Sequence, residues 1–130
     1  MKKAKLYTSL EHKNIIVYKE VFFDDKKTLY IVIENLDGCY LIQKIAEYRD
    51  NGIHFSEEEI WSTLIQILEG LKYLHQNCLI PKNIKSENIF LSENGCVKIG
   101  ELLFFINYIY PIKDYGWYLP PEIFNEQLYN

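Results

Sequence analysis

One predicted helix constrains the fold of this chain more than any other feature of its sequence. Ser56 and Glu59 form a capping-box pattern, in which each side chain satisfies a backbone N–H that the first turn of a helix leaves free. Apolar residues then recur every three or four positions, and further apolar residues widen the stripe that they form. The pattern predicts a helix at about 57–76 that is buried on most sides. The stripe consists of Ile60, Leu64, Ile67, Leu68, Leu71 and Leu74, and Trp61, Ile65 and Tyr73 widen it.

Two pairs of β-rich runs predict two antiparallel hairpins. The runs 15–23 and 28–34 flank the polar sequence DDKK, which suits a turn. The runs NIFL and CVKIG flank Asn94-Gly95, a dipeptide that supplies the positive φ angles of a tight hairpin turn.

Two shorter helices complete the predicted set of elements. The spacing of Leu6, Tyr7 and Leu10 predicts a short helix at the N-terminus, which the sequence HKN ends. The segment 41–48 has the pattern of a short amphipathic helix, and Asn51-Gly52 stops it. Helices and hairpins that follow one another in this way are typical of an α+β fold.

Composition and charge predict a single domain that does not bind nucleic acid. The chain has 130 residues, of which 48% are hydrophobic and 15% aromatic, which suits one domain with a core. Lys and Arg total 14 against 18 Asp and Glu, the net charge is −4, and Arg49 is the single arginine. This balance offers no basic surface for nucleic acid. We therefore expect no nucleic-acid partner.

The cysteines and the apolar runs indicate the cellular compartment of the protein. Cys39, Cys78 and Cys96 are odd in number and lack the spacing of a metal site, so we expect reduced, structural thiols. The longest apolar run, 102–112, is too short to span a bilayer, and the N-terminus lacks the apolar stretch of a signal peptide. These features predict a cytoplasmic protein without a membrane partner.

The order of the elements and five sequence motifs resemble the middle of a eukaryotic protein kinase domain, most closely that of the NIMA-related serine/threonine group. LEHKNIIVYKEVF resembles the end of helix C and the next strand, and TLYIVIENLDGCYL resembles the hinge strand. ILEGLKYLHQNCLI resembles helix E, IKSENIFLSENGCVKIG the catalytic loop with its hairpin, and WYLPPEIF the Ala-Pro-Glu block. The resemblance implies a partial kinase-like domain over 1–130. Residues 1–34 would be a remnant of the N-lobe, and 35–130 would hold the hinge, helices D and E, the catalytic-loop hairpin and the activation segment.

The resemblance also assigns residues to the catalytic site. The family's catalytic loop reads His-Arg-Asp-x-Lys-x-x-Asn, in which Asp accepts the substrate's hydroxyl proton, Lys neutralises the γ-phosphate and Asn holds magnesium. Lys85 and Asn88 match the Lys and the Asn. Asn83 stands where the family has the catalytic Asp, and an amide cannot take a proton at neutral pH. Glu101 stands at the magnesium-chelating Asp of Asp-Phe-Gly, and its side chain is one methylene longer.

The nucleotide-binding positions are also altered in this comparison. Glu34 and Leu36 match the hinge, which in the family presents its backbone to the nucleotide. Lys3 aligns with the helix-C Glu, and the family's glycine-rich loop and strand lysine would precede the first residue. We therefore expect vestigial positions and no bound cofactor. These positions are Asn83 and Lys85 for catalysis, Glu34 and Leu36 for cofactor binding, and Asn88 and Glu101 for metal.

Three hypotheses follow from these substitutions. The first is a catalytically inactive pseudokinase that acts through contacts with an unidentified protein partner. The second is a partial chain of an ATP-dependent serine/threonine kinase, which would use ATP and magnesium. The third is a truncated relic without a stable function. The apolar run 102–112 is interpreted first as core packing against the long helix, with a partner-docking surface as the alternative.

Overall fold

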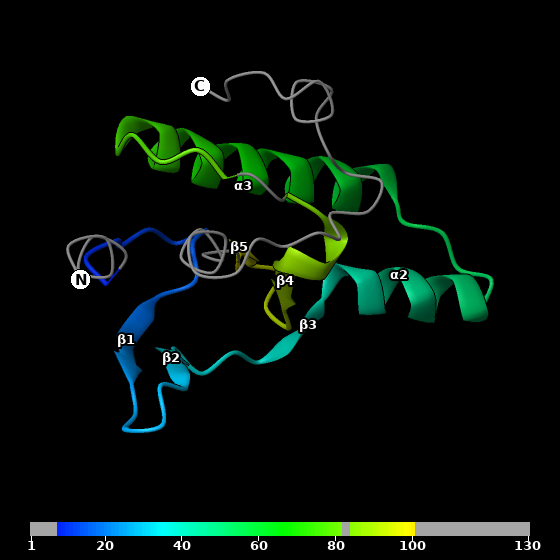
Figure 1. Ribbon diagram of the computed structural model, residues 1–130. Helices are drawn as coiled ribbons and strands as arrows, with labels where there is room; N and C mark the ends of the chain where they lie inside the picture. The colour runs from blue at the N-terminus through cyan, green and yellow to red at the C-terminus, as the bar shows by residue number, and fades with distance from the viewer. Residues whose placement is uncertain (1–7, 82–83, 101–130) are drawn as a thin grey trace, which may run out of the picture.

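The computed structural model describes residues 8–81 and 84–100, which form a mixed arrangement of helices and small antiparallel sheets (Figure 1). This arrangement confirms the predicted α+β class. In chain order the elements are β1 (Tyr18–Phe23), β2 (Leu29–Ile33), β3 (Gly38–Tyr40), α2 (Leu41–Asp50), α3 (Glu57–Gln76), the single-turn 3₁₀ helix η1 (Ser86–Asn88), β4 (Ile89–Ser92) and β5 (Val97–Ile99). Neither α2 nor α3 is long and apolar enough to cross a membrane, and the described residues hold no other α-helix.

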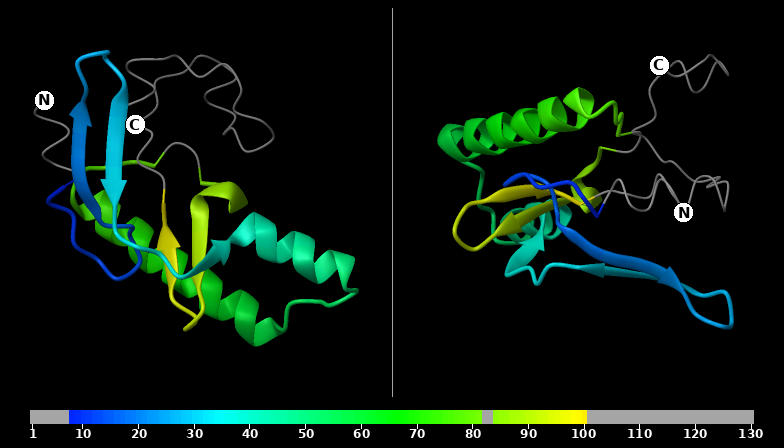
Figure 2. Two further views of the ribbon diagram at one scale, coloured as in Figure 1. Left: turned by 90° about the horizontal axis from the view of Figure 1, so that it is seen from below. Right: turned by 90° about the vertical axis from the view of Figure 1, so that its left-hand side faces the viewer.

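The first predicted hairpin is confirmed, although its first strand is shorter than predicted. β1 pairs with β2 in antiparallel fashion, with Phe23 opposite Leu29. Both views of Figure 2 show this hairpin extending away from the other described elements. The strand begins at Tyr18 because Ile15 instead forms an isolated parallel bridge with Ile99 of β5. The start of the predicted run therefore joins the interior of the molecule and not the hairpin.

The second sheet contains one strand that the sequence analysis did not predict. Its order is β3-β4-β5, and the predicted β4–β5 hairpin is present. The expected turn chemistry was wrong at one position. Gly95 has a positive φ of 82°, but Asn94 is not among the described residues with positive φ. The Asn94 side-chain oxygen instead accepts a hydrogen bond from the Cys96 N–H at 3.1 Å. Asn94 thus stabilises the turn through its side chain.

The predicted bounds of α3 and its capping box are confirmed. The Glu59 N–H donates to Ser56 Oγ at 3.2 Å, and the Ser56 N–H donates to Glu59 Oε2 at 2.7 Å. The prediction for 41–48 is confirmed by α2, which runs to Asp50. No helix is present in 8–14, where the structure has turns, and the rest of that predicted helix lies outside the described residues.

The core lies between α3, the β4–β5 hairpin and the segment 10–18. Gly70 lets α3 approach this segment closely, because a Cβ atom there would lie 2.9 Å from the Asn14 carbonyl oxygen. The buried apolar residues are Leu10, Ile15, Ile16, Tyr18, Leu74, Ile89, Phe90, Val97 and Ile99.

The prediction that α3 is buried on most sides was wrong. Gly70 and Leu74 are its only buried residues. Among the strands and helices of the described residues, α3 packs mainly against β5, so its other side stays open. The exposed apolar residues of α3, with 40–55% of their surface accessible, are Ile60, Trp61, Leu64, Ile65 and Leu68.

Candidate functional site

The predicted hinge residue Glu34 is held by its side chain as well as by its backbone. Its Oε1 accepts hydrogen bonds from Lys98 Nζ at 2.8 Å and from the Val17 N–H at 2.9 Å, while its own N–H donates to the Val17 carbonyl. Burial raises the pKa of Glu34, but the hydrogen bonds from Lys98 and Val17 together outweigh this effect. The net pKa therefore lies below the ordinary value of 4.5. The side chain of Glu34 thus connects the link between β2 and β3 to strand β5.

The second predicted hinge residue, Leu36, packs against the core cluster. The following residue, Asp37, accepts a hydrogen bond through its carbonyl from the Glu93 N–H at 3.2 Å. The link between β2 and β3 is therefore attached both to the core and to the β4–β5 turn.

The described part of the predicted catalytic loop is a short, well-bonded turn. Lys85 precedes η1 and Asn88 ends it, and the Asn88 N–H donates to the Lys85 carbonyl at 2.9 Å. The Asn88 carbonyl accepts from the Gly100 N–H at 2.8 Å, and the Tyr18 hydroxyl donates to the Gly100 carbonyl. These contacts bring Lys85 and Asn88 next to the end of β5. Asn83 and Glu101 lie outside the described residues, so the predicted catalytic and metal groupings stay predictions.

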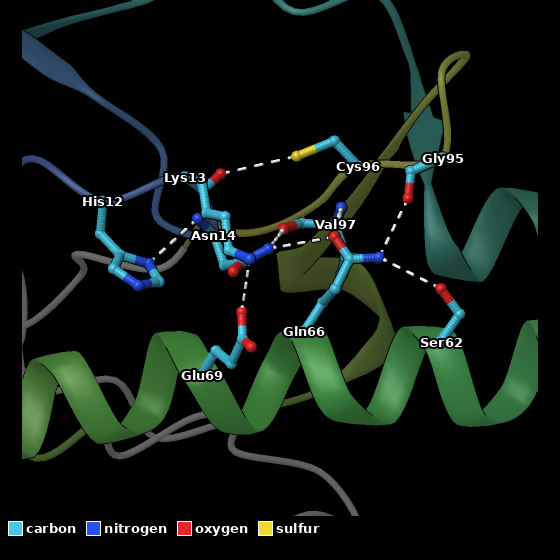
Figure 3. A network of polar contacts seen from close by, with 9 residues as sticks. All are labelled: His12, Lys13, Asn14, Ser62, Gln66, Glu69, Gly95, Cys96 and Val97. Atoms are coloured by element: carbon cyan, nitrogen blue, oxygen red, sulfur yellow. Dashed lines mark hydrogen bonds and ion pairs between the residues drawn. The ribbon is translucent and has the colours of Figure 1, made fainter.

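A partly buried polar network lies between the N-terminal segment, α3 and the β4–β5 hairpin (Figure 3). Asn14 is fully buried, and its Nδ2 donates to Gln66 Oε1 at 3.1 Å and to the Val97 carbonyl at 2.8 Å. Gln66 also accepts from the Val97 N–H at 2.9 Å and donates to the Gly95 carbonyl at 3.0 Å. Two amide side chains therefore form hydrogen bonds with the Gly95 and Val97 backbone of the β4–β5 hairpin, although the buried Asn14 Oδ1 has no hydrogen-bond partner among the described residues.

The N-terminal segment contributes three more contacts to this network. The His12 ring stacks on Tyr73 with ring centroids 4.8 Å apart, and its Nδ1 accepts from the Asn14 N–H at 3.1 Å. Burial, together with the charge of Lys13, lowers the pKa of His12 and favours the neutral ring that this hydrogen bond requires. Lys13 forms an ion pair with Glu69 of α3 at 2.7 Å (Figure 3).

Gln66 and Lys98 were not predicted as partners in this site. Both occur within recognisable patterns. Lys98 alternates with buried Val97 and Ile99, which places it on the opposite face of β5. Gln66 is a polar residue inside an apolar helical run. Within the described ranges, no group of three or more His, Cys, Asp or Glu side chains is placed to hold a metal ion.

Comparison with known proteins identifies the family to which this chain belongs. The model of the protein kinase domain matches residues 1–130. The chain belongs to the protein kinase family. Its kinase domain is 34% identical over 139 residues to serine/threonine-protein kinase Nek3 of Mus musculus, a match that covers 99% of this chain and 26% of the relative.

Two further relatives confirm the resemblance to the NIMA-related group. Serine/threonine-protein kinase Nek5 of Mus musculus is 36% identical, with 96% of this chain and 21% of the relative covered. Probable serine/threonine-protein kinase nek2 of Dictyostelium discoideum is 32% identical, with 98% of this chain and 32% of the relative covered. This kinase chain therefore spans at most 32% of the length of these three relatives.

Proposed function

We propose that this kinase-family chain is catalytically inactive and acts through contacts with a protein partner. The observation that carries the proposal is Asn83, which stands where the family's catalytic loop has its Asp. Loss of a positioned general base lowers a rate by about 10²–10⁴. An amide of the same shape preserves the loop but leaves no group there to accept the substrate's proton.

A second substitution weakens the metal-binding part of the site. Glu101 stands at the chelating Asp, and its extra methylene shifts the carboxylate, whereas magnesium requires near-ideal octahedral geometry. Loss of such an electrostatic contribution costs roughly 3 kcal/mol or more of transition-state stabilisation. In addition, residues 101–122 contain no Ser or Thr that could serve as a phosphorylation switch.

The alternative is that the chain is part of an ATP-dependent serine/threonine kinase. Lys85 and Asn88 favour it, because both are the residues that the family uses toward phosphate and magnesium. Under the first proposal these two are vestigial, as are the hinge positions Glu34 and Leu36. No cofactor is then expected. A cytoplasmic location without nucleic-acid or membrane partners is also proposed.

Nucleotide binding distinguishes the two proposals. A ligand that binds only the folded state stabilises it by RT ln(1 + [L]/Kd), about 2.7 kcal/mol at ~100 times Kd. We expect no magnesium-dependent rise in melting temperature with millimolar ATP, for the unmodified chain or for Asn88→Ala. A rise that requires magnesium and disappears in Asn88→Ala would contradict the expectation that no cofactor binds and would favour the alternative.

A further inference from the structure

The outer face of α3 carries an apolar stripe that the other described residues leave exposed. This α3 stripe consists of Trp61, Leu64, Ile65 and Leu68, whose exposed fractions are 40–55%. Separations of three, one and three residues place them on one side of the helix, and the two buried residues of α3 lie on the other side. Figure 1 and the right-hand view of Figure 2 show the strands on one side of α3 as well. The stripe therefore faces away from the core.

The α3 stripe is large enough to form a small protein interface. Ile60 lies beside it and is 55% exposed. A large apolar side chain presents roughly 200 Å² when fully exposed, so the stripe and Ile60 together leave roughly 500 Å² uncovered. An apolar patch of this size marks an interaction site more often than an ordinary surface. If two such patches covered each other, they would bury roughly 1,000 Å² in total, which is the lower limit of a specific interface.

The two ends of the α3 stripe carry opposite charges. Glu57 lies one turn before Trp61, and Lys72 lies one turn after Leu68. Both charged residues are exposed. Glu57 is held against the stripe, because its Oε1 accepts a hydrogen bond from Trp61 Nε1 at 3.3 Å. A face that is acidic at one end, apolar in the middle and basic at the other end is complementary to a reversed copy of itself.

We propose that two copies of this chain associate through the α3 stripe, with the two α3 helices antiparallel. A two-fold axis between Leu64 and Ile65 places Glu57 of each copy beside Lys72 of the other, because these two residues are equally far from the axis along the helix. The opposed dipoles of the two helices favour the same direction. A parallel pair would instead place Glu57 beside Glu57 and Lys72 beside Lys72.

This inference goes beyond the proposed inactivity and does not rest on it. It names a second copy of the chain as one protein contact, and none of the predicted hinge and catalytic positions lies on α3. An interface of this size implies a dissociation constant of roughly 10–100 µM. At protein concentrations well below this range the chain is a monomer, and Leu68 then contributes little to the free energy of unfolding.

Sedimentation equilibrium of the full chain without nucleotide tests the association. Between about 1 and 300 µM, we expect the molecular mass to rise towards twice that of a single chain. Leu64→Glu puts a charge beside the two-fold axis and should weaken association at least tenfold. The matched control is Ile53→Glu, at a 50% exposed apolar residue outside α3, which should change the dissociation constant less than twofold. Circular dichroism melts confirm that each variant is folded.

Charge reversal tests the direction of the two helices. Glu57→Lys and Lys72→Glu should each weaken association by roughly threefold to thirtyfold, because each places like charges at both ends of an antiparallel pair. The double variant restores opposite charges and should return the dissociation constant to within about threefold of the parent value. In a parallel pair, either single reversal would leave like charges facing each other as before and would change nothing.

Several outcomes would overturn the dimer proposal. These are a monomer at 300 µM, a dimer that Leu64→Glu does not weaken, equal weakening by Ile53→Glu, or charge reversals that do not compensate each other. A monomer that becomes dimeric on Phe105→Glu would assign the α3 stripe to residues 102–112 of the same chain instead. A monomeric chain leaves the inactivity proposal standing, whereas phosphoryl transfer would contradict inactivity without affecting the sedimentation result.

Discussion

The polar network around Asn14 and Gln66 and the polar loop before β4 differ in their roles. In the network, Asn14 and Gln66 form hydrogen bonds with the Val97 backbone and connect it to α3. In the loop before β4, Lys85 and Asn88 match the family's residue types, whereas Asn83 stands where the family's motif has Asp. The network connects elements of the fold, whereas the loop holds residues that the family uses in catalysis. If the proposed inactivity is correct, the kinase fold is kept here without its activity.

The difference has a physical basis in burial. Replacing a buried polar residue leaves its partners without hydrogen bonds in a medium that cannot replace them, which destabilises the protein directly. Replacing Asp by Asn in a loop changes proton affinity but little of the shape. Variants in the network should therefore change the free energy of unfolding, whereas variants in the loop should not.

The largest expected effect is a difference in the free energy of unfolding between variants on the two sides of α3. Leu74 is 1% exposed and belongs to the core cluster, whereas Leu68 on the same helix is 53% exposed. We expect Leu74→Ala to lower the free energy of unfolding by about 2–5 kcal/mol, because the cavity it leaves adds to the lost transfer energy. The matched control Leu68→Ala should cost roughly 0.5 kcal/mol or less. Urea denaturation of both variants measures this, and equal losses would contradict the described packing.

A smaller effect is expected in the polar network. Asn14→Ala removes the donor to Gln66 and to the Val97 carbonyl, so the buried Val97 carbonyl loses this hydrogen bond, whereas Gln66 Oε1 still accepts from the Val97 N–H. We expect a loss of about 1–3 kcal/mol in the free energy of unfolding. The exposed Asn35 provides the control, because Asn35→Ala should change stability little. An Asn14→Ala protein as stable as the parent would show that the network does not support the hairpin.

The smallest expected effect on stability concerns Glu34 and depends on pH. Because the pKa of Glu34 in the folded chain lies below 4.5, the carboxylate contributes stability above that value. This contribution is lost as the pH falls through the folded pKa. We expect Glu34→Gln to be less stable than the parent at pH 7, by about 1 kcal/mol, and the gap to be smaller at pH 3 than at pH 7. Chemical denaturation at both pH values measures the gap, and a gap independent of pH would contradict the ionised Glu34–Lys98 pair.

Local sequence signals predicted the elements well and their surroundings less well. The capping box and the apolar spacing predicted the bounds of α3, because both act within one helical turn. Strand β3 was missed, since Gly38–Tyr40 gains its structure only by pairing with β4, which is distant in the sequence. Burial of α3 was overestimated for the same reason. Apolar periodicity shows which side chains favour burial, but it does not show which elements cover them.

Local motifs predict only part of the contacts in the candidate site. Family motifs predicted Lys85, Asn88, Glu34 and Leu36 as site residues, and the first two lie at the two ends of η1 in the structure. The Glu34–Lys98 pair joins residues 64 positions apart, and the Asn14–Gln66 bond joins residues 52 positions apart. No local pattern predicts such pairs, because they depend on how the hairpin and α3 pack together.

Phosphoryl transfer tests the central claim, that the chain keeps the kinase fold without kinase activity. Labelled ATP, magnesium and a generic Ser/Thr substrate are incubated with the unmodified chain, with its Lys85→Ala variant, and with an active NIMA-related kinase as a positive control. We expect the unmodified chain to transfer no more phosphate than a no-protein control, because Asn83 cannot accept the substrate's proton. Transfer above that control that Lys85→Ala abolishes would exclude a contaminating kinase and contradict the claim.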